Sequence, residues 1–214
     1  LTPLKDVLNA VSTCCDSPLV ENIYVIDNSP DDGLCEALPS KAKVKYIHNP
    51  SNPGYGAAHN IAINESLSQN IPFHLVLNAD VIFDYRILEQ IVSYADRYKN
   101  VGLIAPKMFY EDGSVQCSRK LLPTPINMFL RAFLPKPFRT RIDDRFQLEC
   151  FEHDRPLFVP YVSGAFMFLR TSVLDKIGVF DERFFMYPED IDLSRRIAQN
   201  ADVRFVPDFT ITHK

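Results

Sequence analysis

Apolar positions along the chain follow two alternating patterns, one helical and one strand-like. At the start, Leu4, Val7, Leu8 and Val11 recur at the spacing of an amphipathic helix. Further on, short apolar runs alternate with longer stretches of helical period. They predict strands at 23–26, 44–47, 73–77, 101–105, 161–170 and 203–206, and helices at 57–67, 84–98 and 190–198. This order predicts an α/β fold in which helices flank a parallel or mostly parallel sheet.

Composition narrows the class of protein. The 214 residues suffice for one domain with a buried core, and no internal repeat or interdomain linker is visible. The net charge of −4 does not predict nucleic-acid binding, and no apolar stretch approaches the roughly 20 residues of a membrane span. The scattered cysteines include no CxxC pair, which argues against a zinc site and suits reduced thiols. We therefore expect one cytoplasmic domain over residues 1–214.

Polar residues follow the predicted strands at their carboxyl ends, where ligands bind in open α/β sheets. Asp27 and Asn28 follow the first of these strands, and Asn78 and Asp80 follow the third. Asp80 could reach a divalent ion that bridges the phosphates of a nucleoside diphosphate, although capping of the next turn explains a lone aspartate better. Asp27 suits a base or ribose hydroxyl as well as it suits turn chemistry.

Two further sites have weaker local signals. The loop from Asn52 to Gly56 leads into a helix, and its glycines would let backbone N–H groups approach a phosphate. Loops of this composition are, however, common before helices without any ligand. His213 follows the last predicted strand and would complement Asp80 as a metal ligand, but a single histidine is more often structural.

Three carboxylates crowd the first turn of the predicted helix at 190–198. Glu189, Asp190 and Asp192 suit the positive end of the helix dipole, and capping alone explains one or two of them. The aromatic run 184–187 precedes them, and such a run can shield a carboxylate from water and raise its proton affinity. That environment suits a general base that removes the proton of an attacking hydroxyl.

Five stretches in fixed order carry a resemblance to a known family. They are residues 23–29 (IYVIDNS), 52–60 (NPGYGAAHN), 75–80 (LVLNAD), 162–167 (VSGAFM) and 178–193 (GVFDERFFMYPEDIDL). Together they resemble the family 2 glycosyltransferases, inverting enzymes of the GT-A fold. The likeness is greatest to the rhamnosyltransferase-like bacterial members that build cell-surface polysaccharides. Each stretch is moderately specific, and the ordered set covers nearly the whole chain.

The resemblance implies a role for each candidate residue. Asp80 and His213 would hold Mg²⁺ or Mn²⁺, Asp190 would be the catalytic base, and Glu189 would lie beside it. The residues that would bind the nucleotide or the substrates are Asp27, Asn28, Gly54, Asn60, Asn78, Ser163 and Gly164.

The chain departs from the family pattern in two places. The Asp-x-Asp motif of the family reads Asn78-Ala79-Asp80, and an amide is a poorer ligand than a carboxylate for a hard cation. The first strand of the family fold has no counterpart after Leu1, so we expect the natural protein to extend upstream.

The sequence thus predicts an inverting, metal-dependent glycosyltransferase of surface-polysaccharide synthesis. It would move a sugar such as rhamnose from a UDP-, dTDP- or GDP-linked donor to a glycan or lipid-linked acceptor. Residues 1–100 would bind the nucleotide sugar and residues 101–214 the acceptor. The basic and apolar segment 119–141 would contact the inner face of the cell membrane, or would form a solvated loop. Two alternatives stay open: a sugar nucleotidyltransferase, and a degenerate domain that binds nucleotide sugar or glycan without catalysis.

Overall fold

The computed structural model describes residues 2–116 and 155–214, so the basic segment 119–141 lies outside the described residues. The helices are α1 (Leu4–Asp16), α2 (Leu34–Ala37), α3 (Tyr55–Ser68), α4 (Arg86–Arg97), α7 (Thr171–Ile177) and α8 (Glu189–Ala198). The strands are β1 (Ile23–Asp27), β2 (Val44–His48), β3 (Phe73–Leu77), β4 (Val81–Ile82), β5 (Val101–Phe109), β6 (Val115–Gln116), β7 (Leu157–Phe158), β8 (Phe166–Arg170) and β9 (Asp202–His213). No helix in these two ranges is long and apolar enough to cross a membrane.

The predicted elements are present, with some changes of length. β5 and β9 extend beyond the predicted strands, and the strand predicted over 161–170 begins only at Phe166. The short elements α2, β4, β6, β7 and α7 were not predicted, because two to seven residues give too little periodicity to recognise.

The sheet is mixed, which corrects the prediction of mostly parallel strands. Its order is β3-β8-β5-β9-β4, with β6 on β5 and β7 on β9, while β1 and β2 form a separate pair. Of the pairs described, β1–β2 and β5–β9 are parallel and the others are antiparallel. β3 and β5 point the same way, as expected for strands joined through a helix, but β8 lies between them and runs opposite to both. An apolar run predicts a strand but does not predict its direction.

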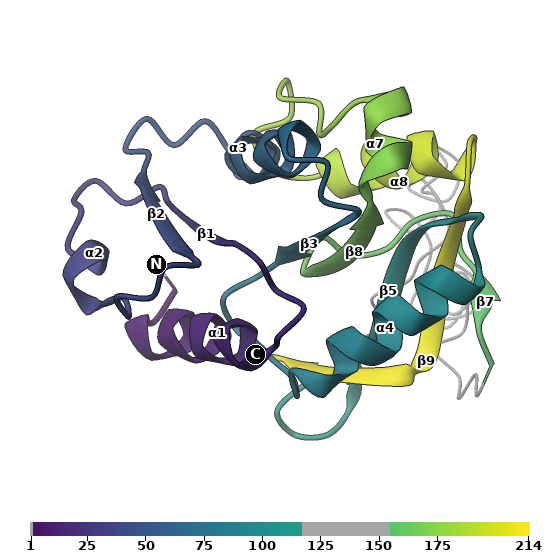
Figure 1. Cartoon of the computed structure of the whole chain (residues 1–214), viewed down its shortest axis with the longest axis horizontal. Coiled ribbons are helices and arrows are strands. Elements are labelled where there is room, and N and C mark those ends of the chain that lie inside the picture. Colours follow the sequence, from purple (N-terminus) through teal and green to yellow (C-terminus); the bar gives the residue numbers. More distant parts are fainter. Residues whose placement is uncertain (1, 117–154) are drawn as a thin grey trace, which may run out of the picture.

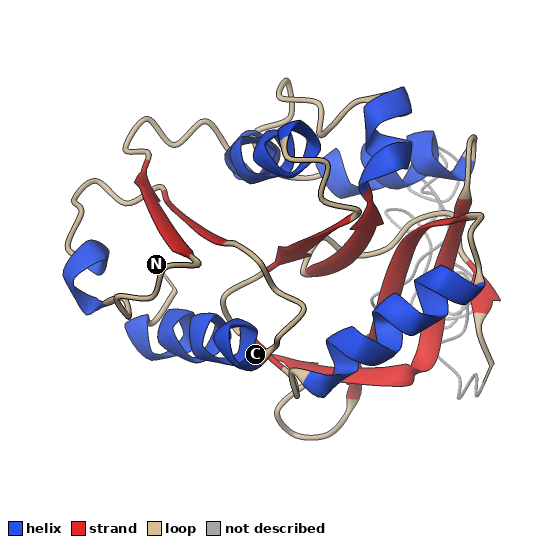
Figure 2. Cartoon of the chain, viewed as in Figure 1, coloured by secondary structure: helices blue, strands red, loops and turns tan. Residues whose placement is uncertain are grey.

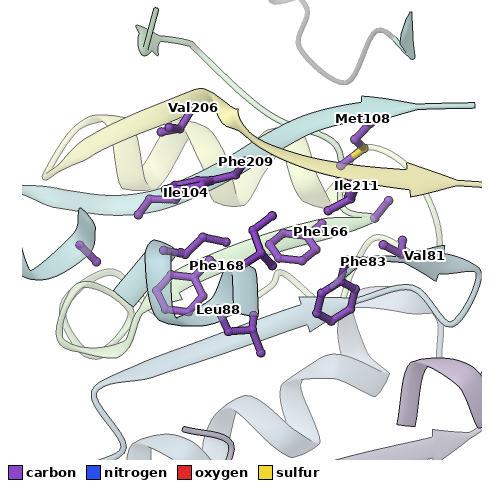
Figure 3. Packing of buried hydrophobic residues seen from close by; sticks show 14 of the residues in the cluster. Val81, Phe83, Leu88, Ile104, Met108, Phe166, Phe168, Val206, Phe209 and Ile211 are labelled. Atoms are coloured by element: carbon purple, nitrogen blue, oxygen red, sulfur yellow. The ribbon is translucent and has the colours of Figure 1, made fainter. Parts of the chain in front are cut away.

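Helices cover both faces of this sheet, so the α/β class is confirmed (Figures 1 and 2). α3, α7 and α8 lie on one face, and α4 lies on the other. Because side chains alternate along a strand, β8 supplies both cores: Phe166 and Phe168 pack toward α4, whereas Met167 and Leu169 pack toward α7 and α8. Figure 3 shows the core on the α4 side of the sheet, in which Phe166 and Phe168 pack together with Ile104 and Leu88.

The two halves of the chain share the sheet. β3 and β4 come from residues before 100, and each pairs with a strand from the second half, β8 and β9 respectively. The chain ends beside α1, where the Lys214 ammonium donates to the buried carboxylate of Asp6 at 2.6 Å (Figure 1). Residues from both halves therefore meet where β3 ends and β9 ends.

Candidate functional site

A cavity of about 430 Å³ lies between β1 and β3, with α1 and α3 along its sides. Its polar lining contains three of the predicted residues, Asn28, Asn78 and Asp80, together with Tyr55 from the start of α3. Polar residues that follow β1 and β3 thus lie at one cavity, and their role in binding a ligand stays a prediction. Three clusters of side chains lie at or near this cavity: Asn28 of the first and Asp80 of the second line it, and Tyr55 connects it to the third.

The first cluster surrounds Asp27 at the end of β1. Its buried carboxylate accepts hydrogen bonds from the Ser29 backbone N–H at 3.0 Å and from the Tyr46 hydroxyl at 2.9 Å. Burial favours the neutral acid, but these hydrogen bonds outweigh it and lower the pKa of Asp27 below its ordinary value. Asn28 accepts a hydrogen bond from the Asn49 side chain at 3.1 Å. Asp27 is therefore a fixed carboxylate, able to accept from a ligand N–H or hydroxyl.

The second cluster joins Asp80 to His213, although the two residues lie far apart in the sequence. β4 begins at Val81, whose partner in β9 is His213, and this register places the imidazole beside the aspartate. His213 Nε2 lies 3.3 Å from Asp80 Oδ1, and His213 Nδ1 lies 2.9 Å from Gln116 Oε1. Because a glutamine Oε1 only accepts, Nδ1–H donates to Gln116, and Nε2 is the ring nitrogen that faces Asp80.

This pair fits a divalent cation. Two lone-pair atoms 3.3 Å apart repel each other unless a cation or a proton lies between them. Ligands about 2.1 Å from an octahedral ion lie about 3 Å apart when they occupy adjacent positions. Within residues 2–116 and 155–214 no group of three or more His, Cys, Asp or Glu side chains could hold a metal. An ion held here would thus need oxygens from a substrate or water, as Mg²⁺ commonly does beside phosphates.

The third cluster lies at the start of α8, opposite the loop that precedes β8. Asp190 is half-buried, and its carboxylate accepts from the Gly164 N–H at 3.1 Å and from the Ile191 N–H at 2.8 Å. Ser163 accepts from the Ala165 N–H at 3.4 Å in the same loop. The predicted neighbours Ser163, Gly164 and Asp190 are therefore brought together.

Glu189 differs from Asp190 in its surroundings. It is only 4 % exposed, and its Oε2 has no hydrogen-bond partner among the described residues. Burial raises the pKa of Glu189 above its ordinary value, and the charge of Asp190 adds to the rise. Glu189 thus has the raised proton affinity that we predicted for this turn, whereas Asp190 has the access to solvent.

The aromatic run before α8 does not provide the predicted shielding. Of the run 184–187, Phe185, Met186 and Tyr187 are exposed and only Phe184 is partly buried. Glu189 is instead buried against α3, where a Cβ placed on Gly56 would lie 3.6 Å from its own Cβ. Burial of Glu189 therefore comes from helix packing rather than from the preceding loop.

Tyr55 links the second and third clusters. Its hydroxyl lies 3.0 Å from Asn78 Oδ1 and 2.8 Å from the Gly164 carbonyl oxygen, so one proton is shared between two acceptors. Burial, followed by the charges of Asp190, Glu189 and Asp80, raises the pKa of Tyr55 well above its ordinary value. The hydroxyl therefore keeps its proton and holds the end of β3 to the loop before β8.

Two predicted substrate-binding residues have structural partners instead. Asn60 is buried, and its amide donates to the Phe180 carbonyl oxygen and to Glu182 and accepts from the Phe180 N–H. These bonds use both N–H groups and leave no polar atom facing a ligand, which corrects the prediction for Asn60. Gly54 has φ +106°, and a Cβ there would lie 2.3 Å from the Phe185 carbonyl oxygen. That carbonyl also accepts the Tyr55 N–H, so Gly54 serves loop packing and the phosphate role stays a prediction.

The sequence reasoning missed Tyr55, Tyr46 and Gln116. Tyr55 lies within the stretch 52–60 that carries the resemblance. Its position at the start of a helix, beside the predicted ligand-binding loop, could have identified it as a site residue. Tyr46 and His48 alternate on β2, whose parallel register puts His48 beside Asp27. Gln116 belongs to a two-residue strand and has no local signal, because only the sheet brings it to His213.

Comparison with known proteins places the chain in a family. Residues 3–178 match the family model described as Glycosyl transferase family 2. The chain is 28% identical over 227 residues to the N-acetylglucosaminyl-diphospho-decaprenol L-rhamnosyltransferase of Mycobacterium tuberculosis, an alignment that covers 98% of this chain and 71% of the relative. It is 26% identical over 197 residues to the rhamnosyltransferase WbbL of Escherichia coli K12, covering 89% and 72%.

A solved structure shows the same fold. The crystal structure of GalNAc-T7 with UDP, GalNAc and Mn²⁺ superposes with a TM-score of 0.62 at 16% identity. The superposition covers 91% of this chain and 38% of that one. The chain thus spans well under half of the neighbour's length.

Proposed function

The chain belongs to glycosyl transferase family 2, and from that premise we propose that it transfers a sugar with inversion from a nucleotide-diphospho-sugar to a saccharide hydroxyl. The observation that carries the proposal is the Asp80–His213 pair, which lies at the same cavity rim as Asn78 and is joined through Tyr55 to Asp190. A site for a diphosphate-bound cation and a site for a base thus lie on the two sides of one tyrosine.

The donor would lie along the first half of the chain. Asp27 would accept from the base or the ribose, and Asn28 and Asn78 would offer amide groups from the cavity wall. Asp80 and His213 would hold Mg²⁺ or Mn²⁺, which neutralises the charge on the leaving diphosphate when it is bound. The Mn²⁺ and UDP named for the solved neighbour support this reading.

The acceptor would lie along the second half of the chain, against Asp190. The acceptor oxygen attacks the anomeric carbon as its proton passes to an Asp190 oxygen, and the bond from that carbon to the diphosphate breaks with its electron pair on the leaving oxygen. Attack opposite the leaving group inverts the anomeric centre. The Gly164 and Ile191 N–H groups hold the carboxylate in place for this step. Glu189 is too buried to contact an acceptor, and it would act only through its neighbour Asp190.

The relatives suggest the sugar and the acceptor. Both are named rhamnosyltransferases, and the name of the mycobacterial one gives an N-acetylglucosaminyl-diphospho-lipid as its acceptor. We therefore take rhamnose as the first donor sugar to test, and an N-acetylglucosaminyl-diphospho-lipid as the first acceptor, in synthesis of a surface polysaccharide.

Calorimetric titration tests the donor site. The chain is titrated with UDP, dTDP and GDP, each with and without Mn²⁺, alongside the variants Asp80→Ala and Asp84→Ala. Asp84 is an exposed carboxylate paired with Arg86, so its variant controls for loss of one charge. We expect one nucleotide to bind only with Mn²⁺, with binding lost in Asp80→Ala and kept in Asp84→Ala. Equal binding in all three proteins would refute the metal site.

The non-catalytic alternative rests on one observation, the amide of Asn78 in place of a carboxylate. It predicts that the chain binds the nucleotide sugar but forms no product with the acceptor. Incubation with dTDP-rhamnose and N-acetylglucosaminyl-diphospho-farnesol, followed by mass spectrometry, separates the two functions. A product heavier by one deoxyhexose supports transfer, and an unchanged acceptor with bound donor supports the alternative.

A further inference from the structure

Three consecutive apolar side chains face solvent immediately before α8. Phe185 is 56 % exposed, Met186 52 % and Tyr187 79 %. The other large apolar side chains that are exposed in the described ranges stand singly along the chain. Single exposed apolar residues are ordinary, whereas a contiguous group commonly marks a binding surface. We call these three residues the aromatic platform.

The backbone of the platform is held firmly, although its side chains are free of the core. The Phe185 carbonyl oxygen accepts the Tyr55 N–H at 2.9 Å, and the Pro188 carbonyl oxygen accepts the Asp192 N–H at 3.0 Å. Gly54 packs directly on the Phe185 backbone. A surface fixed before its ligand arrives loses little conformational entropy on binding. The sequence therefore keeps these side chains exposed at a defined position.

The charges around the platform favour a neutral ligand over an anionic surface. The carboxylates closest in the sequence are Glu182, Glu189, Asp190 and Asp192, and the neighbouring Arg183 is paired with Asp181. Anionic lipid head groups are attracted by clustered lysines and arginines, which the described part of this loop does not contain. A neutral sugar ring has no such requirement, and its C–H face is attracted by the negative face of an aromatic ring.

We propose that the aromatic platform, and Tyr187 above all, binds the sugar ring of the acceptor and presents its hydroxyl to Asp190. The inference rests on the proposed function, and it adds the residues that position the acceptor. Tyr187 is the most exposed of the three, and only Pro188 separates it from the turn that contains Glu189 and Asp190. A ring stacked on Tyr187 would thus lie beside the base.

Binding of two acceptor probes tests the platform. The full chain, loaded with Mn²⁺ and the nucleotide that it binds, is titrated with N-acetylglucosaminyl-diphospho-farnesol and with lipid-free methyl N-acetylglucosaminide. The same titrations use Tyr187→Ala, Tyr187→Phe and Tyr98→Ala, the last an exposed aromatic at the end of α4. We expect Tyr187→Ala to weaken both probes about tenfold. Tyr187→Phe keeps the ring and should bind nearly as the parent does, and Tyr98→Ala should match the parent.

Each other outcome overturns the inference in a recognisable way. Unchanged affinity in Tyr187→Ala, or no acceptor binding by the parent, removes the platform as an acceptor site. Weakening of the farnesyl probe alone would make it a site for the lipid chain, and lost binding to anionic vesicles would make it a membrane contact. Nucleotide titration of the same proteins distinguishes failure of the proposed function from failure of the platform. If the parent binds no nucleotide, the proposed function fails, whereas intact nucleotide binding with unaltered acceptor affinity removes the platform alone.

Discussion

The carboxylates of the site are positioned in two different ways. Asp80 meets His213 because β4 pairs with β9, and His213 is oriented by Gln116 from a third strand. Glu189 and Asp190 are neighbours in the sequence, and the first turn of α8 is enough to place them together. The cation site therefore depends on the pairing of strands from distant parts of the chain, whereas the base site depends on one helix and the loop before β8.

This contrast has a consequence for mutation. A residue in the cation site has partners on several strands, so its loss should change metal and nucleotide affinity. Asp190 accepts hydrogen bonds from Gly164 and Ile191, which belong to the loop before β8 and to α8 rather than to the cation site, so its loss should change the chemical step and leave the donor site intact. The experiments below separate these two behaviours.

The largest effect is expected for Asp190→Asn. The amide keeps the shape of the side chain but cannot take a proton, so kcat should fall by about 10²- to 10⁴-fold. Nucleotide affinity, measured by calorimetry, should stay within about twofold of the parent. Asp192→Asn is the matched control, because Asp192 is an acid of the same turn that pairs with Arg196. Comparable kcat losses in both variants would mean that kcat depends on the negative charge of this turn as a whole, and that Asp190 is not the catalytic base.

The next largest effect is a loss of folding stability at acid pH, caused by two buried histidines in the donor half of the chain. Burial lowers the pKa of His59 to about 4 and that of His74 to about 3, the latter with a contribution from His59. Well above pH 6.5 both rings are neutral whether the chain is folded or not. As the pH falls from about 6.5 toward these folded values, only the unfolded chain takes up the protons, so stability is lost. Denaturant unfolding should show a loss of roughly 2 kcal/mol per ring between pH 7 and pH 5.

A variant checks the assignment. His74→Gln keeps a polar partner for Ser66, whose hydroxyl lies 2.8 Å from His74 Nδ1, but it removes one titrating ring. The slope of stability against pH should then fall by about half. An unaltered slope would assign the acid sensitivity to other groups.

Sequence reasoning predicted the local features of this molecule well and the long-range ones poorly. The helices, the apolar strands and the Glu189–Asp190 turn follow from periodicity and capping, which act within a few residues. The direction of β8 and the contact between Gln116 and His213 depend on strand pairing between distant segments, which no local pattern encodes. The sequence suggested Asp80 and His213 as complementary metal ligands, from their positions after strands and from the resemblance, but it did not give the β4–β9 pairing that brings them together.

Asn60 shows a different limit. An asparagine in a stretch that carries the resemblance was taken as a ligand-binding group, but the structure uses it to tie α3 to the Phe180 backbone. A buried amide with satisfied hydrogen bonds and a ligand-facing amide have the same sequence signal. Burial and partners, which only the fold provides, distinguish them.

A smaller effect is expected for His213→Asn, about tenfold weaker Mn²⁺ binding, because one imidazole ligand is replaced by a weaker amide ligand. Mn²⁺ titration in the presence of the nucleotide measures it. Gln116→Leu keeps the imidazole but removes its hydrogen-bond partner, and it should give a loss of the same sign and smaller size. If Gln116→Leu weakens Mn²⁺ binding and His213→Asn does not, the contact between β6 and β9 affects Mn²⁺ binding and His213 is not a metal ligand.

The smallest effect is expected for Tyr55→Phe, which tests whether the two sites act together. Removal of the hydroxyl ends its contacts with Asn78 and Gly164 and should lower the free energy of unfolding by about 1 kcal/mol. If Tyr55 couples the sites, nucleotide affinity and kcat should both fall, and a double-mutant cycle with Asn78→Ala should give a non-zero coupling energy. Loss of stability with both functional readouts unaltered would mean that the cation site and the base site are positioned independently, each by its own strands and helix.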